Sequence, residues 1–172
     1  MKRTIRRYLA VLPMVAAGLG AARGQAMGNP GGEVGMLLVL DAPASQGQVK
    51  LRVELENRGK RTVLVPRAVA SMERLLGNVF TVTDAVTGEA VTYVGPMVKR
   101  GPLTAADYLA LKPGQRHRHV IDIGPAYDFK PGRHDYRVSY AGHYVADARA
   151  LAGTGAPGMP LEAPPVTFSV AR

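Results

Sequence analysis

Short apolar stretches, either alternating or continuous, recur along most of the chain and predict an all-β fold. The clearest is residues 49–56, where every second residue is apolar and those between are charged. Such alternation is typical of a strand with one face in water. Turn residues separate the stretches. The predicted strands are 34–40, 49–56, 62–65, 79–83, 90–94, 115–123, a strand containing residues 136–140, and 166–170.

The spacing of these strands predicts an immunoglobulin-like antiparallel β-sandwich of about seven to eight strands. The turn at 57–60 predicts a hairpin between 49–56 and 62–65. Short helical turns are expected around 68–76 and 104–109. In the pattern Pro-Gly-x-x-x-Tyr-x-Val at 131–138, Tyr136 is either a corner residue or ordinary core. The Ala-, Gly- and Pro-rich stretch 142–165 is interpreted as a long mobile loop.

The first 26 residues have the pattern of a cleaved signal peptide. Lys2, Arg3, Arg6 and Arg7 precede an apolar run at 8–20, and small residues follow it. The run is too short to span a bilayer. We therefore expect a signal peptide at 1–26, a flexible lead-in at 27–33 and one domain at 34–172. The protein would be periplasmic or secreted, and only an uncleaved signal peptide would hold it to a membrane.

The charge balance changes once this segment is removed. The 172-residue chain has a net charge of +9, but cleavage after Ala26 removes five of its 22 basic residues and none of its 13 acidic ones, leaving +4. The remaining arginines are scattered, which argues against nucleic acid as a partner. The chain has no cysteine, which excludes thiol catalysis and cysteine-ligated metals. The sequence leaves the oligomeric state open.

Several motifs together resemble one known family, across residues 34–141. They are Leu75-Leu-Gly-Asn-Val-Phe-Thr-Val, Val91-Thr-Tyr-Val-Gly-Pro-Met-Val-Lys-Arg-Gly-Pro, Ala106-Asp-Tyr-Leu-Ala-Leu-Lys-Pro-Gly, Ile121-Asp-Ile and Tyr127-Asp-Phe. The chain resembles the non-catalytic N-terminal region of peptidyl-Lys metalloendopeptidases, which are relatives of deuterolysin. In that family a separate downstream domain carries the zinc motif His-Glu-x-x-His.

That zinc motif is absent from this sequence, because none of its four histidines is followed by glutamate. Zinc hydrolysis of this kind needs two histidines one helical turn apart and a glutamate. The resemblance therefore implies a free-standing accessory domain, not an enzyme, and no cofactor is predicted. Its expected partner is an exported protease or another envelope protein, toward which it would act as an inhibitor, in a propeptide-like role or as an adaptor.

The resemblance is most specific at residues 95–101, where a basic pair is held between two Gly-Pro units. The candidate partner-binding residues are Gly95, Pro96, Met97, Val98, Lys99, Arg100 and Gly101. Because the resembled enzymes cut beside lysine, one hypothesis is that Lys99 enters the acidic specificity pocket of such a protease. The alternative is that the loop covers an open edge of the sandwich, with Lys99 in solvent.

A second candidate site is the pair His117 and His119, which share one face of a predicted strand. With His134 or His143 they would suit zinc or copper, which would make the protein a periplasmic metal- or small-ligand-binding protein. The cation of the intervening Arg118 and the lack of a neighbouring carboxylate argue against this alternative. The other interpretation is that they form the polar start of a strand whose core residues are Ile121 and Ile123.

Overall fold

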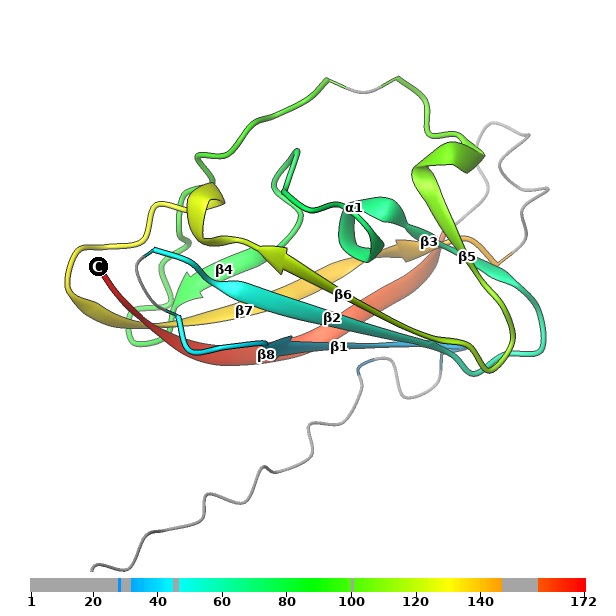
Figure 1. The fold of residues 1–172 in the computed structure, drawn as a ribbon, viewed down its shortest axis with the longest axis horizontal. Helices are drawn as coiled ribbons and strands as arrows, with labels where there is room; N and C mark the ends of the chain where they lie inside the picture. The colour runs from blue at the N-terminus through cyan, green and yellow to red at the C-terminus, as the bar shows by residue number, and fades with distance from the viewer. Residues whose placement is uncertain (1–27, 29–31, 45–46, 100, 147–157) are drawn as a thin grey trace, which may run out of the picture.

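The computed structural model describes residues 28, 32–44, 47–99, 101–146 and 158–172, in which eight strands are joined by irregular segments and short helices (Figure 1). The strands are β1 (Val34–Leu40), β2 (Lys50–Asn57), β3 (Val63–Pro66), β4 (Thr81–Asp84), β5 (Tyr108–Leu111), β6 (Arg116–Asp122), β7 (Arg133–Tyr144) and β8 (Met159–Ala171). The helices are α1 (Arg67–Ala70) and the 3₁₀ turns η1 (Ala105–Asp107) and η2 (Gly124–Ala126).

Two three-stranded antiparallel sheets form the body of the molecule. One has the order β1-β2-β6 and the other β4-β7-β8, while β3 and β5 form a separate pair. In chain order these match strands A-B-E and C-F-G of the immunoglobulin sandwich. The predicted all-β, immunoglobulin-like sandwich is therefore confirmed.

The core lies between the two sheets, where the alternation in the sequence predicts it. On β2 and just before it, Val49, Leu51, Val53 and Leu55 are at most 1% exposed. The inward residues of β7, Tyr136, Val138 and Tyr140, join the same cluster. Because a strand turns successive side chains to opposite faces, one register places all of these apolar groups inside.

Tyr136 occupies a corner of the sandwich as well as its core. Its side chain is fully buried, and its hydroxyl accepts a hydrogen bond of 3.0 Å from the backbone N–H of Lys130. A tyrosine near the start of strand F that bonds to backbone a few residues upstream is typical of immunoglobulin-like domains. Of the two interpretations of Tyr136, the structure therefore supports the corner residue. Its hydrogen bond to Lys130 fixes the connection between β6 and β7.

The predicted hairpin between 49–56 and 62–65 is wrong. Strand β2 pairs with β1 on one side and with β6 on the other, so neither edge is free for β3. The side chain of Asn57 redirects the chain instead: its amide donates to the carbonyls of Arg61 and Leu111, and its oxygen accepts from the N–H of Gly59. Strand β3 then pairs with β5.

Two further local predictions need correction. Residues 90–94 form no strand; the β-bridges that involve them are the single ones Thr83–Ala90 and Tyr93–Tyr127. The expected helical turns are shorter than predicted: α1 covers four residues, and η1 passes directly into β5, which the sequence pattern missed. The reason is that β3 offers β5 a free edge, which no local pattern reveals.

The stretch 142–165 is not wholly a loop. Strand β7 continues to Tyr144 and β8 begins at Met159, and the two pair across this region, as at His143–Pro160. Prolines are tolerated in β8 because an edge strand needs hydrogen bonds on one side only. Residues 147–157, the predicted signal peptide and most of the lead-in lie outside the described residues. Within the described ranges, no helix has the length and apolar character needed to cross a bilayer.

Candidate functional site

The segment 94–104, here called the arch, carries the predicted partner-binding loop. It leaves the sandwich beside η2 and returns to it at η1, and Figure 1 shows it as a wide curve outside α1. At its start the N–H groups of Val94 and Gly95 both donate to the carbonyl of Ala126, at 2.9 and 3.2 Å. Further along, Val98 N–H donates to the carbonyl of Leu76 at 3.3 Å.

Tyr93 anchors the arch to the aromatic core. Its ring packs edge-on against Tyr127, with centroids 5.5 Å apart, and its hydroxyl donates to the carbonyl of Pro96 at 2.8 Å. Gly95 is required for this contact, because a Cβ there would lie 2.7 Å from the Tyr93 hydroxyl oxygen. Burial raises the pKa of Tyr127 to about 12, and its hydroxyl donates a 2.6 Å hydrogen bond to the Phe80 carbonyl.

The far end of the arch is held by a capping box. Asp107 accepts hydrogen bonds from the N–H and the hydroxyl of Thr104 at 2.9 and 3.0 Å, and its own N–H donates to the Thr104 carbonyl. Arg67 of α1 reaches the same turn by donating to the carbonyl of Ala106 at 3.0 Å. Such reciprocal bonds fix the entry to a helical turn, so the arch is tethered to the sandwich at both ends.

Between these tethers the arch presents apolar side chains to solvent. Met97 is 79% exposed, and Val94, Val98 and Leu103 are each more than half exposed. Lys99 is exposed beside them and makes no ion pair within the described part of the chain, while Arg100 lies outside the described residues. Single exposed apolar residues are ordinary on a protein surface, but here four large ones lie within the eleven residues of the arch.

An apolar groove lies next to the arch. It has a volume of about 240 Å³, and its lining includes Pro66, Leu76, Val79, Leu103 and Tyr108. Leu103 therefore belongs both to the arch and to the groove. The sequence analysis missed this groove, because β3, β5 and the segment after α1 come together only in the folded chain. The one sequence signal for Leu103 was an apolar residue directly after a Gly-Pro turn.

The histidines of the predicted metal site face backbone carbonyls. His117 and His119 do share one face of β6, as predicted, and that face is the inner one, opposite Leu55 and Val53 of β2. Each Nε2 lies 2.6 Å from a carbonyl oxygen, that of Ala70 for His117 and that of Met72 for His119. These contacts join β6 to the segment that follows α1.

The structure does not bring the other proposed ligands to this pair. His134 lies at the start of β7, where its Nε2 is 2.9 Å from the Pro131 carbonyl, and His143 lies near the end of that strand. In the ranges that the structure describes, no three histidine or carboxylate side chains are grouped so as to hold a metal ion.

No family model matches the chain, and no curated protein does either. Among solved structures, one likeness is to ycdA, a lipoprotein candidate of Bacillus subtilis subsp. subtilis str. 168, with a TM-score of 0.30 and 17% identity. That match covers 80% of this chain and 35% of ycdA. Another is the Northeast Structural Genomics Consortium target SoR45, with a TM-score of 0.31, 13% identity, and coverage of 81% and 84%. At these TM-scores the likenesses carry no argument about function.

Proposed function

We propose that this protein is an exported, non-catalytic binding module that engages a metalloprotease through the arch. The observation that carries the proposal is the arrangement of the arch itself. Its ends are fixed by Tyr93 and by the Thr104–Asp107 capping box, while Met97, Val98 and Lys99 are exposed between them. A loop that is already ordered loses less entropy on binding than a free one.

The chemistry of the arch suits a protease that recognises lysine. Lys99 provides an exposed cation, and Met97 and Val98 provide apolar area directly before it. An acidic specificity pocket would take the ammonium group, and the apolar side chains would cover its rim. The choice of a metalloprotease rests on the resemblance of residues 34–141 to the accessory region of peptidyl-Lys metalloendopeptidases.

A binding titration with a lysine-specific zinc endopeptidase tests the proposal. We expect Lys99→Ala to weaken binding by tenfold or more, which corresponds to about 1.4 kcal/mol or more, as for a buried charged contact. Lys60→Ala is the matched control, since Lys60 is also an exposed lysine but lies in the β2–β3 connection. It should leave the affinity unchanged.

Two further variants separate the specificity pocket from general attraction. Lys99→Arg keeps the charge but alters its shape, and Met97→Ser removes only apolar contact. We expect intermediate losses from both. Equal affinity of native protein and Lys99→Ala, or no binding to the protease at all, would contradict the proposal.

A further inference from the structure

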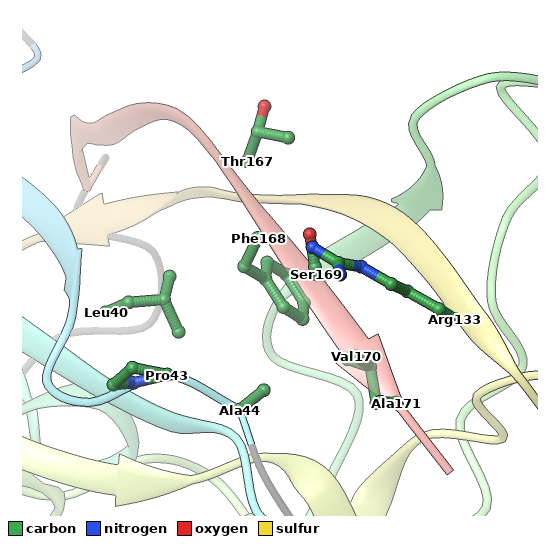
Figure 2. Close-up of a pocket in the computed structure, with 9 residues that line it drawn as sticks. All are labelled: Leu40, Pro43, Ala44, Arg133, Thr167, Phe168, Ser169, Val170 and Ala171. Atoms are coloured by element: carbon green, nitrogen blue, oxygen red, sulfur yellow. The ribbon is translucent and has the colours of Figure 1, made fainter. Parts of the chain in front are cut away.

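Over the last third of β8, no described strand pairs with the edge that faces away from β7. In the described part of the chain β8 pairs with β7 alone, so its other edge has no strand partner. Beside that edge lies a cavity of about 430 Å³, bounded by Leu40, Pro43 and Ala44 on one side and by β8 on the other (Figure 2). Figure 2 shows that the ring of Phe168 lies on the side of β8 that faces this cavity.

At its other end the seam between β1 and β8 is closed by the chain itself. Gly28 forms a bridge with Met36, on the edge of β1 that faces away from β2, through a 2.9 Å bond from its N–H. A side chain at Gly28 would collide with the carbonyl of Glu162 in β8. Gly28 thus fills this seam at one end, and the cavity marks the end where no described residue does so.

The hydrogen-bond pattern shows which groups of β8 are free. Gly132 and Arg172 exchange both of their backbone bonds, at 3.0 and 3.2 Å. In an antiparallel pair, bonded and non-bonded residue pairs alternate. The backbone groups of Val170 and Phe168 therefore bond to β7. The N–H and C=O groups of Thr167, Ser169 and Ala171 point to the opposite edge, away from β7.

The residues on this edge lack the usual protection against pairing. From Ala163 to Ala171 the strand carries no charge, and from Val166 onward it has no proline. Natural edge strands are commonly blocked by charges, proline or bulges. The only irregularity in the β7–β8 ladder lies between Val138 and Tyr140, before this section.

We propose that β8 pairs with β8 of a second copy of this chain, antiparallel and centred on Ser169. This register is self-complementary, as a twofold contact requires. On the inner face Phe168 meets Val170 of the second copy, and on the outer face Thr167 meets Ala171. No like charges oppose each other, and aromatic pairs with β-branched residues stabilise sheets. The side chain of Arg172 is turned back onto its own molecule, with bonds to the carbonyls of Gly124 and Phe129.

Cysteine cross-linking tests the register directly, because the chain has no cysteine of its own. Ser169 would face its own copy at a Cα separation of about 5.5 Å, within the range of a disulfide. Ser169→Cys should form a disulfide-linked dimer under mild oxidation. Thr167→Cys is the control, since its two copies would lie about 13–14 Å apart. Equal cross-linking of both variants would overturn the proposal.

A charge pair provides a second test, read by light scattering after size exclusion. Thr167→Glu with Ala171→Glu should dissociate the dimer, because each glutamate would oppose another across the twofold axis. Within one molecule both would lie beside arginines, Arg137 and Arg133, so the fold should be retained. Thr167→Glu with Ala171→Lys should keep the dimer. A native protein that stays monomeric at all soluble concentrations, or a dimer that survives the double glutamate variant, would overturn the proposal.

Discussion

The aromatic corner of the sandwich and the arch are stabilised in opposite ways. At the corner, Phe129 lies 4.8 Å from the ring of Tyr136 and 6.0 Å from that of Phe168, and all three are at most 6% exposed. The arch buries little, and a few backbone hydrogen bonds and one tyrosine hydroxyl hold it. The corner thus contributes stability through burial, while the arch keeps its apolar side chains available for contact.

The largest expected effect comes from emptying the corner. Phe129→Ala removes a ring packed on three sides by aromatic residues, and Arg172 lies over it at 5.7 Å. We expect a loss of about 3–5 kcal/mol in the free energy of unfolding, because both burial and packing are lost. Met97→Ala, in the arch, should stay within about 0.5 kcal/mol. Urea denaturation measures both, and similar losses would mean that the arch is part of the packed core.

A smaller effect depends on pH and concerns the turn after β4. The carboxylate of Asp84 accepts the backbone N–H groups of Thr87 and Val86, and these bonds, with Lys130 nearby, lower its pKa from 3.8 to about 2. The folded state therefore holds fewer protons than the unfolded chain, and this contribution is lost as the pH falls through the interval between those values.

Asp84→Asn makes this contribution measurable. We expect the variant to be less stable than the native protein near neutral pH, because it lacks the charge that Lys130 and the turn N–H groups favour. The difference should shrink as the pH falls from 3.8 toward 2. Thermal unfolding across this range checks it, and a difference that does not change with pH would contradict the assignment.

A small effect on stability is expected at the Tyr93 anchor of the arch. Tyr93→Phe removes the hydroxyl bond to the exposed Pro96 carbonyl but keeps the ring on Tyr127. We expect a loss of about 0.5–1 kcal/mol, together with faster proteolysis within the arch and weaker partner binding. Tyr136→Phe is the matched control at the corner, because the same atom is removed from a partly buried bond to Lys130. Tyr136→Phe should lower the free energy of unfolding more than Tyr93→Phe does, and it should leave proteolysis of the arch unchanged. A larger loss of stability from Tyr93→Phe would contradict the comparison.

Strands were predictable wherever one face of the sheet must be buried. The alternation from Val49 to Leu55 and at Tyr136, Val138 and Tyr140 identified inward residues correctly, because a slip of one residue would expose them all. Strand partners were not predictable in this way. The turn after β2 suggested a hairpin, but the bonds of the Asn57 side chain to Leu111 and Arg61 carry the chain away from β2. The bond to Leu111 depends on β5, which is more than fifty residues further along the chain.

For the candidate site too, local features were predictable from the sequence and contacts between distant segments were not. The sequence identified the Gly-Pro units and Lys99 as an unusual connection, and it placed His117 and His119 on one face. It missed Leu103 and the apolar groove, because their neighbours come from segments far apart in the chain. It also could not show that the two histidines face the carbonyls of Ala70 and Met72.

By itself, the sequence determined the all-β class, the inward faces of the longest strands and the exposed arch between two Gly-Pro units. These features follow from local periodicity and backbone restriction, which act within a few residues. Only the tertiary structure decided that β2 lies between β1 and β6, that Tyr136 closes a corner onto Lys130, and that no described strand pairs with the edge of β8 that faces away from β7. The physical reason is that strand pairing and side-chain burial join residues distant in the chain, and many pairings satisfy the same local pattern.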